Sequence, residues 1–253
     1  MTKKTDQKTV LVTGAASGIG LATRDVFREQ GWQVLAADKK SVKSPMPEGV
    51  HFIQTDLSDP AEIGKLTARV ADLAPDGMQA LVNNAALQRT ASLKDTAIED
   101  WDELMAVNLR APFLLAQALY PLLKKGSAAI VNVASVHALA TSAEIGAYAA
   151  SKGGLVALTR SMAIEFAEDG MRVNAVLPGA TDTNMLADGL SRSGTSADES
   201  KAQLESKILL GRVADPREIA SAIFFLADEQ QSSYITGQSL VVDGGATTRL
   251  SSE

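Results

Sequence analysis

Residues 13 to 20 are Thr13-Gly14-Ala15-Ala16-Ser17-Gly18-Ile19-Gly20, and they join an apolar run directly to a helical pattern. The run Val10–Thr13 predicts a buried strand, and Ile19–Gln30 predicts a helix. Glycine permits a tight turn and a close approach of the backbone to a ligand. The first N–H groups of the helix have no partner within it and attract a pyrophosphate. The stretch therefore indicates a dinucleotide-binding turn, although three glycines alone also suit a plain strand–helix turn.

Outward from this turn, apolar runs alternate with longer amphipathic segments, as in βα units around a parallel sheet. The pattern predicts one doubly wound α/β domain over residues 1–253, with about seven parallel strands and helices on both faces. The expected strands are Val10–Thr13, Gln33–Ala37, His51–Gln54, Ala80–Asn83, Ala128–Ala134, Arg172–Leu177 and Ser239–Val242. The expected helices are Ile19–Gln30, Ala61–Leu73, Trp101–Leu123, Tyr148–Glu168 and Pro216–Leu226.

Composition argues against several classes of protein. The chain has 253 residues, of which 45% are hydrophobic and 21% charged, so a folded domain is expected. A net charge of −6 argues against a nucleic-acid partner. There is no Cys, and His51 and His137 are too far apart for a local zinc motif, so no metal is expected. The N-terminus lacks an apolar signal core, and polar residues and a proline interrupt Leu104–Leu123, so we expect no membrane segment and a cytoplasmic location.

Asp38 follows the second expected strand, 18 residues beyond Gly20. A carboxylate at this place accepts hydrogen bonds from ribose hydroxyls and repels a 2′-phosphate. NAD is therefore expected in preference to NADP. Lys39 and Lys40 leave NADP open, because either could counter the phosphate, although neighbouring lysines on a loop are usually only solvated.

Further motifs follow in order: Asp56-Leu57, Asn83-Asn84-Ala85-Ala86 and Pro178-Gly179-Ala180-Thr181-Asp182-Thr183. With the glycine turn, they resemble the short-chain dehydrogenase/reductase family over nearly the whole chain. Ala86 departs from the usual glycine, which crowds the cofactor slightly or alters local backbone freedom. The resemblance implies a Rossmann-type fold and a nicotinamide cofactor contacted by Gly14, Ser17, Gly18, Ile19, Gly20, Asp38, Asp56, Leu57, Asn84, Ala85, Ala86, Tyr148, Lys152, Pro178, Gly179, Thr181 and Thr183.

Asn108, Ser135, Tyr148 and Lys152 resemble the catalytic Asn-Ser-Tyr-Lys set of that family. Tyr148 and Lys152 are four residues apart, so a helix presents both on one face. A phenol with a pKa near ~10 is a poor base, but a nearby ammonium and an oxidised nicotinamide favour the phenolate. Ser135 ends an expected strand, where its hydroxyl can bind the reacting oxygen. The resemblance implies that Asn108 anchors a water linking Lys152 to solvent.

The substrate pocket has three candidate residues, Gln88, His137 and Asn184. An extended backbone would place the side chains of Ser135 and His137 on the same side, although a histidine satisfied by backbone groups explains His137 equally well. A similar Gln/His pair occurs in family members that bind 3-hydroxybutyrate. Those members also use a basic residue shortly before the catalytic Tyr, whereas residues 144–147 here are Glu-Ile-Gly-Ala. A small carboxylate would lack that clamp.

Thr183–Gly211 interrupts the regular alternation and predicts a mobile substrate lid. Its polar stretch Ser191–Asp198 suggests flexible chain, and an apolar face is offered by Met185, Leu186 and Leu190. A permanently packed pair of surface helices is the alternative, which the apolar residues Leu204, Ile208, Leu209 and Leu210 also suit.

These observations predict an oxidoreductase that transfers a hydride between NAD and a secondary alcohol of the sugar, polyol or small hydroxy acid class, with Tyr148 as acid/base. An NADPH-dependent carbonyl or 3-ketoacyl reductase is the alternative within the family. A nonenzymatic dinucleotide-binding protein would need the glycine turn and Asp38 but not the catalytic set. A serine hydrolase is disfavoured because no G-x-S-x-G elbow is present. The resemblance implies a homo-oligomer, most simply a tetramer.

Overall fold

The computed structural model describes residues 7–42, 45–190 and 196–248, without the side chain of Ala197. Seven parallel strands form one sheet in the order β3-β2-β1-β4-β5-β6-β7. They are β1 (Thr9–Thr13), β2 (Gln33–Asp38), β3 (Val50–Gln54), β4 (Ala80–Asn83), β5 (Ala129–Val133), β6 (Arg172–Pro178) and β7 (Ser239–Val242). The doubly wound sheet is confirmed, and each expected strand differs from the observed one by at most one residue at either end. Strands β1, β4 and β5 are buried throughout because helices cover both faces.

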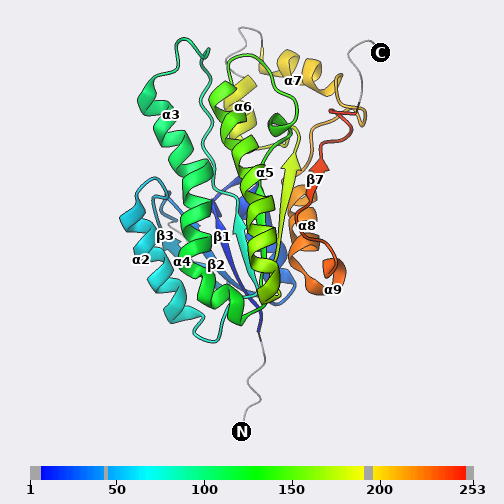
Figure 1. Cartoon of the computed structure of the whole chain (residues 1–253). Coiled ribbons are helices and arrows are strands. Elements are labelled where there is room, and N and C mark those ends of the chain that lie inside the picture. Colours follow the sequence, from blue (N-terminus) through cyan, green and yellow to red (C-terminus); the bar gives the residue numbers. More distant parts are fainter. Residues whose placement is uncertain (1–6, 43–44, 191–195, 249–253) are drawn as a thin grey trace.

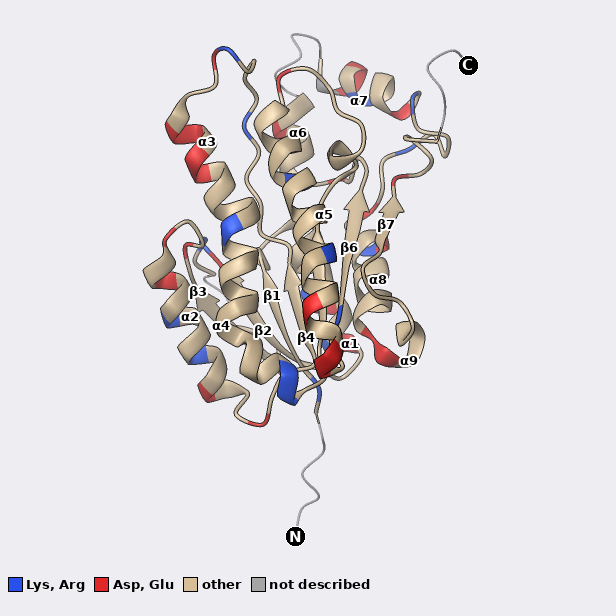
Figure 2. Cartoon of the chain, viewed as in Figure 1, with Lys and Arg blue, Asp and Glu red and all other residues tan. Residues whose placement is uncertain are grey.

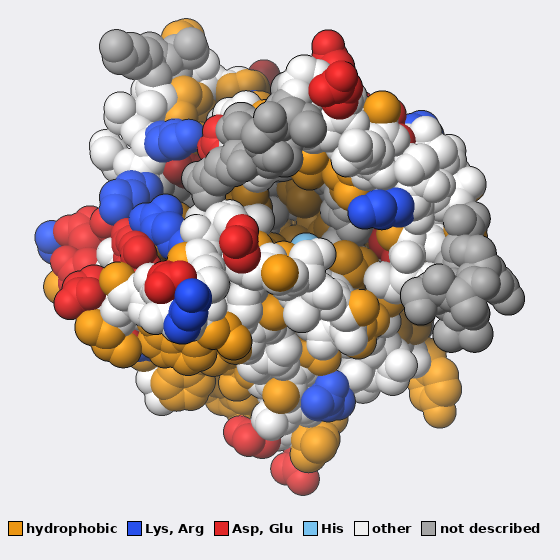
Figure 3. All heavy atoms as spheres, turned by 90° about the horizontal axis from the view of Figure 1, so that it is seen from above, with side chains coloured by type: hydrophobic (Ala, Val, Ile, Leu, Met, Phe, Trp, Pro, Cys, Tyr) orange, Lys and Arg blue, Asp and Glu red, His pale blue; other side chains and the backbone are white. Residues whose placement is uncertain are grey.

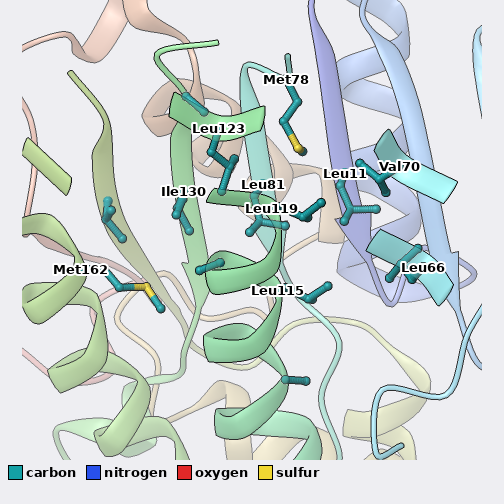
Figure 4. Packing of buried hydrophobic residues seen from close by; sticks show 14 of the residues in the cluster. Leu11, Leu66, Val70, Met78, Leu81, Leu115, Leu119, Leu123, Ile130 and Met162 are labelled. Carbon is teal, nitrogen blue, oxygen red and sulfur yellow. The ribbon is translucent and has the colours of Figure 1, made fainter. Parts of the chain in front are cut away.

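The helices form a layer on each face of the sheet (Figure 1). On one face lie α1 (Gly18–Glu29) and α8 (Pro216–Ala227), joined by edge contacts among Phe27, Trp32 and Phe224. On the other lie α2 (Pro60–Leu73), α4 (Ala111–Lys125) and α5 (Gly146–Phe166). Leucines of α4 pack over Leu81 and Ile130 of the sheet, as Figure 4 shows. Charged residues gather on helix surfaces and loops and leave the strands nearly free of charge (Figure 2).

One helix over Trp101–Leu123 was expected, and the chain is helical throughout this range, but not as a single α-helix. The chain forms α3 (Ile98–Met105), a π-helical turn η1 (Ala106–Arg110) and then α4. Asn108 lies in that turn and is fully buried. A π turn inserts an extra residue into a helix and commonly marks a functional site. The sequence did not reveal it because the apolar pattern runs on through the turn.

Two helices stand where a flexible insertion was expected. They are α6 (Asn184–Leu190) and α7 (Ala197–Glu205). Ser196 caps α7: its Oγ accepts the N–H of Glu199 at 3.3 Å, while the Glu199 carboxylate accepts the N–H of Ser196. Residues 196–198 therefore start a helix and are not flexible chain, whereas Ser191–Thr195 lie outside the described residues. Short turns η2 (Val136–Ala138), η3 (Ala167–Asp169) and α9 (Glu229–Ser232) complete the chain.

The carboxyl ends of the strands point toward α6 and α7 (Figure 1). Viewed from that end, the surface is hollowed, and hydrophobic side chains lie within and beside the hollow (Figure 3). Within the described ranges, no helix has the length and apolar character needed to cross a membrane.

Candidate active site

The glycine turn is built so that side chains have no room. A Cβ on Gly20 would lie 2.0 Å from the carbonyl oxygen of Gly14. Gly14 itself has φ +67, and its Cβ would lie 2.8 Å from the Cα of Ala85. Gly18 has φ +53 and faces the methyl group of Thr183 at 3.0 Å. Backbone conformation and close packing therefore both require glycine here.

Hydrogen bonds tie this turn to the end of β4. Thr13 Oγ1 accepts the N–H groups of Asn84 at 3.0 Å and Ala85 at 3.1 Å. The Asn84 amide donates to the carbonyl of Thr13 at 2.9 Å. Strands β1 and β4 are neighbours at the point where the strand order reverses, which is where open α/β sheets bind ligands. The α1 N-cap, Ser17, forms no side-chain cap, so the first N–H groups of that helix are left to a ligand.

Asp38 ends β2 and faces the glycine turn. Its Oδ2 accepts the N–H of Ala16 at 2.9 Å, and its Oδ1 accepts the N–H of Lys40 at 2.8 Å. Lys39 points elsewhere, because its Nζ lies 2.8 Å from Oδ2 of Asp56. This ion pair, together with hydrogen bonds from Ser58, lowers the pKa of Asp56 to about 2. The carboxylates of Asp38 and Asp56 thus have different partners, and the leucine that follows Asp56, Leu57, is buried in the core.

The four catalytic candidates meet at the carboxyl edge of the sheet. Ser135 follows β5, and its side chain shares a hydrogen bond with that of Tyr148 in the first turn of α5. One helical turn further, Lys152 donates from Nζ to the carbonyl of Val133 at 2.8 Å. Its Nζ lies 5.6 Å from the centre of the Tyr148 ring. The spacing of four residues does bring the phenol and the amine together, as the sequence predicted.

Asn108 reaches this group through Ser151. Its Nδ2 donates to Ser151 Oγ at 3.1 Å, and that hydroxyl donates to the carbonyl of Tyr148 at 2.7 Å. Both polar atoms of the Asn108 amide also bond the backbone of Leu87, at 2.8 and 2.9 Å. The buried amide therefore joins the loop after β4 to the first turn of α5.

Burial dominates the electrostatics of the pair. It raises the pKa of Tyr148 to about 12, and the hydrogen bond with Ser135 opposes this shift. It lowers the pKa of Lys152 to about 7. Both side chains are almost fully buried, so a charge on either is costly unless it is matched by a partner.

The expected extended backbone between Ser135 and His137 is wrong. Residues 136–138 form the 3₁₀ turn η2, which Ser135 caps by accepting the N–H of His137 at 3.2 Å. The turn nevertheless brings the imidazole to Tyr148, with ring centres 6.0 Å apart. Thr141 Oγ1 lies 3.3 Å from Nδ1 of the same ring. Burial lowers the pKa of His137, so the ring is neutral at pH 7.

The other substrate candidates are less constrained. Gln88 is half-buried and directly follows Leu87, the residue held by Asn108. Asn184 begins α6 and is exposed. Ala86 is half-buried, two residues before Gln88. Of this loop, the backbone of Leu87 is tied to Asn108 by two hydrogen bonds.

The segment after β6, residues 178–183, lies beside the glycine turn. Pro178 ends β6, and Gly179 lies against Asp243, which a Cβ would approach to 2.7 Å. Thr181 Oγ1 donates to the carbonyl of Gly179 at 3.1 Å, and Thr183 Oγ1 donates to that of Thr181 at 3.2 Å. Because Thr183 also contacts Gly18, this segment and the glycine turn lie side by side.

Several residues of the site were not assigned a role from the sequence. They are Thr13 and Ser151, described above, and a buried chain in which Asn83 donates to Asn132 at 2.8 Å and Asn132 to Thr159 at 2.9 Å. Ser151 could have been found, because it lies three residues after Tyr148 on the same helical face. The asparagine chain could not, because pairing between β4 and β5 sets it.

Comparison with known proteins identifies the family. Residues 14–247 match the family model described as Enoyl-(Acyl carrier protein) reductase. The chain is 41% identical, over 94% of its length, to a short-chain type dehydrogenase/reductase of Sinorhizobium fredii, and it spans 43% of that longer protein. The chain belongs to the short-chain dehydrogenase/reductase family.

Other relatives of this dehydrogenase/reductase have named activities. It is 34% identical to meso-2,3-butanediol dehydrogenase of Serratia marcescens, over 96% of this chain and 95% of that one. It is 36% identical to 3-oxoacyl-[acyl-carrier-protein] reductase of Thermotoga maritima, over 94% of this chain and 97% of that one. The aldohexose dehydrogenase of Thermoplasma acidophilum superposes with a TM-score of 0.91 at 27% identity, covering 97% and 96% of the two chains.

Proposed function

We propose that the protein oxidises a secondary alcohol with NAD, and that Tyr148 takes the hydroxyl proton. The observation that carries this proposal is the buried group of Ser135, Tyr148 and Lys152, in which the Lys152 Nζ lies 5.6 Å from the centre of the Tyr148 ring. When bound, the nicotinamide supplies the hydride acceptor, and its positive charge favours the phenolate. Ser135 and Tyr148 hold the substrate oxygen between their hydroxyls, so the carbinol carbon is oriented for transfer.

Lys152 and Asn108 support the tyrosine in this proposal. A protonated Lys152, held by the carbonyl of Val133, stabilises the phenolate electrostatically. Asn108 fixes the first turn of α5 through Ser151 and keeps Tyr148 in register with Ser135. A water anchored by Asn108 would let Lys152 exchange its proton with solvent.

The glycine turn fits a dinucleotide. Gly14, Gly18 and Gly20 keep the turn tight, because a Cβ at each would meet neighbouring protein atoms, and the first N–H groups of α1 that follow the turn can bind a pyrophosphate. Residues of the segment 178–183 line the nicotinamide end, and Asp56 and Leu57 flank the adenine. Asp38, already oriented toward the turn by Ala16, accepts the ribose hydroxyls and opposes a 2′-phosphate. NAD is therefore the preferred cofactor.

An uncharged polyol or sugar is the substrate class we favour over a hydroxy acid. His137 is neutral and lies against Tyr148, so it offers a hydrogen bond rather than a charge. Arg89 lies in the loop after β4, but its guanidinium is already paired with Asp100 and Glu103. It therefore does not offer an unpaired positive charge to the carboxylate of a hydroxy acid. The names of the butanediol and aldohexose dehydrogenases agree with this class.

A 3-oxoacyl reductase that uses NADPH is the second candidate. It is favoured by the Thermotoga maritima relative and by the acyl-carrier-protein description of the family model. Asp38 opposes it, because a carboxylate facing the ribose repels the 2′-phosphate of NADP. A dinucleotide-binding protein without activity is a weaker candidate, because it would not need the buried catalytic group.

We also propose that Thr183–Gly211 is a lid and that the chain assembles as a homotetramer in the cytoplasm. Met185 is exposed at the start of α6, where it can cover a substrate. Phe113 on α4 and Ile164 on α5 expose 43% and 77% of their surface, which suits a helix-to-helix interface. Light scattering at micromolar concentration tests the assembly, and a monomer there would reject it. The absence of Cys suits a reducing compartment.

The test is an activity screen over secondary alcohols, polyols, sugars and hydroxy acids, with NAD and NADP in parallel and reduced nicotinamide as the readout. We expect turnover of an uncharged substrate with NAD. Turnover of a 3-oxoacyl thioester with NADPH, and of no alcohol with NAD, would support the second candidate instead. Cofactor titration without activity on any substrate would support the nonenzymatic one.

A further inference from the structure

The ends of β2 and β3 carry three charged side chains in a small space. Asp38 pairs in register with Gln54, so Lys39 and Asp56 follow at the same edge of the sheet. The backbone here is fixed, because Thr55 donates to the carbonyl of Asp38 at 2.8 Å and the Gln54 amide donates to that of Lys39 at 3.1 Å. The two neighbouring residues Asp38 and Lys39 then point in opposite directions.

The direction of each side chain follows from its partner. Asp38 bonds Ala16 in the glycine turn, on the β1 side of β2. Lys39 bonds Asp56 at 2.8 Å, on the β3 side. The lysine charge is therefore held away from the ribose that Asp38 faces.

Asp56 is itself held in place. Its Oδ1 accepts the N–H of Ser58 at 3.0 Å and the hydroxyl of Ser58 at 2.7 Å, which leaves Oδ2 for Lys39. The carbonyl of Ser58 in turn accepts from the guanidinium of Arg110 at 2.7 Å. A fixed carboxylate loses less side-chain entropy when it binds a lysine than a mobile one does.

We propose that Asp56 is a specificity-determining residue, because its ion pair withholds Lys39 from the 2′-phosphate of NADP. This inference rests on the proposed nicotinamide cofactor and adds a second determinant to Asp38. Without Asp56, the lysine can turn toward a phosphate on the neighbouring ribose, since its side chain is 65% exposed and free to move. Lys39 would thus be a cation able to bind the 2′-phosphate of NADP that Asp56 holds in an ion pair instead.

The effect of Asp56 on the ratio of the NADP and NAD dissociation constants should be small. An ion pair between exposed side chains changes an equilibrium by no more than about fivefold, and a phosphate is a stronger partner than a carboxylate. We therefore expect Asp56→Asn to lower the ratio of the dissociation constants, NADP over NAD, by about two- to fivefold. The ratio is the right measure because both cofactors carry the same adenine, so a lost adenine contact cancels.

A double-mutant cycle by calorimetry tests the inference, with binding alone as the readout. The variants are Asp56→Asn, Lys39→Gln, the pair together, and Asp56→Asn with Lys40→Gln as the matched control, because Lys40 is the exposed lysine next along the chain. We expect the pair with Lys39→Gln to restore the parent ratio and the pair with Lys40→Gln to keep the lowered one. All titrations use one low ionic strength, because salt screens such charges.

Two results would overturn the inference. One is an unchanged ratio in Asp56→Asn. The other is an equal fall in Asp56→Asn with and without Lys39, which would mean that the lost negative charge acts alone. The ratio in the parent protein tests the proposed function separately: if it binds NADP as tightly as NAD, the proposed preference for NAD fails, whatever the cycle shows.

Discussion

The cofactor end and the substrate end of this site are built in different ways. At the cofactor end, backbone packing leaves no choice of residue, since a single methyl group on Gly20 would meet a carbonyl at 2.0 Å. At the substrate end, His137 of the short turn η2 lies against Tyr148, Gln88 is half-buried and Asn184 is exposed. The first arrangement fixes one kind of ligand, whereas the second allows a family of similar folds to accept many substrates.

The largest effect on activity is expected at Tyr148, between the cofactor end and the substrate end. Tyr148→Phe should reduce kcat by about 10³-fold or more, because it removes the acid/base oxygen and keeps the ring. NAD binding, measured by calorimetry, should change by less than about threefold. Tyr234→Phe is the matched control, since it removes the same hydroxyl from a tyrosine that is fully exposed. Near-parent turnover in Tyr148→Phe would mean that another group handles the proton.

One added methyl group in the glycine turn should weaken cofactor binding. Gly20→Ala should raise the dissociation constant of NAD at least tenfold and lower Tm by about 5 °C, because the new Cβ forces the turn apart. Gly64→Ala in α2 is the control: nothing lies within 4 Å of its Cβ, so it should leave binding unchanged and stabilise the helix by up to about 1 kcal/mol. Equal behaviour of the two variants in calorimetry and thermal unfolding would show that the turn tolerates side chains.

The pH dependence of kcat/KM for alcohol oxidation tests the role of Ser135. Alcohol oxidation needs the phenolate, and burial raises the pKa of Tyr148 to about 12, so kcat/KM should rise with pH below that value. The hydrogen bond from Ser135 opposes the shift. Ser135→Ala should therefore raise the pKa further and move the whole profile to higher pH, with about tenfold lower activity at a given pH. A profile that is lowered without moving along the pH axis would limit Ser135 to binding the substrate.

The smallest expected effect concerns the substrate end. Hydrogen exchange in α6 and α7 should slow by a few-fold when NAD and a substrate analogue are both bound, because a closing lid protects amides. Strand β4, buried in the sheet, is the internal control and should not change. Identical exchange of the two helices in the free and bound protein would favour a permanently packed helix pair.

The same contrast explains what could be predicted from the sequence. Strand ends came within one residue, because continuous apolar runs identify buried parallel strands. The Tyr148–Lys152 pair followed from helical spacing, and the glycine turn from its position between strand and helix. The π turn at Asn108 could not be predicted, because the apolar pattern runs on through it, and the partners of Asn108 on Leu87 and Ser151 are distant in sequence.

The direction of side chains was the second feature that could not be predicted from the sequence. The sequence left Lys39 open as a partner for a phosphate, and only the register of β2 and β3 reveals that Asp56 binds it. His137 was placed near Ser135 for the wrong reason, since a 3₁₀ turn and not an extended backbone brings it to Tyr148. Polar residues after β6 suggested flexible chain, but Ser196 and Glu199 form a capping box that starts a helix.

Transfer of deuterium tests the central claim most directly. The protein is incubated with NAD and with each secondary alcohol of the screen, labelled with deuterium at the carbinol carbon, and the cofactor is analysed by mass spectrometry. Direct hydride transfer predicts reduced cofactor that carries one deuterium, formed about 10³-fold or more slowly in Tyr148→Phe. A cofactor that calorimetry shows to be bound, yet that stays unreduced or is reduced without label across the whole panel, would contradict the claim.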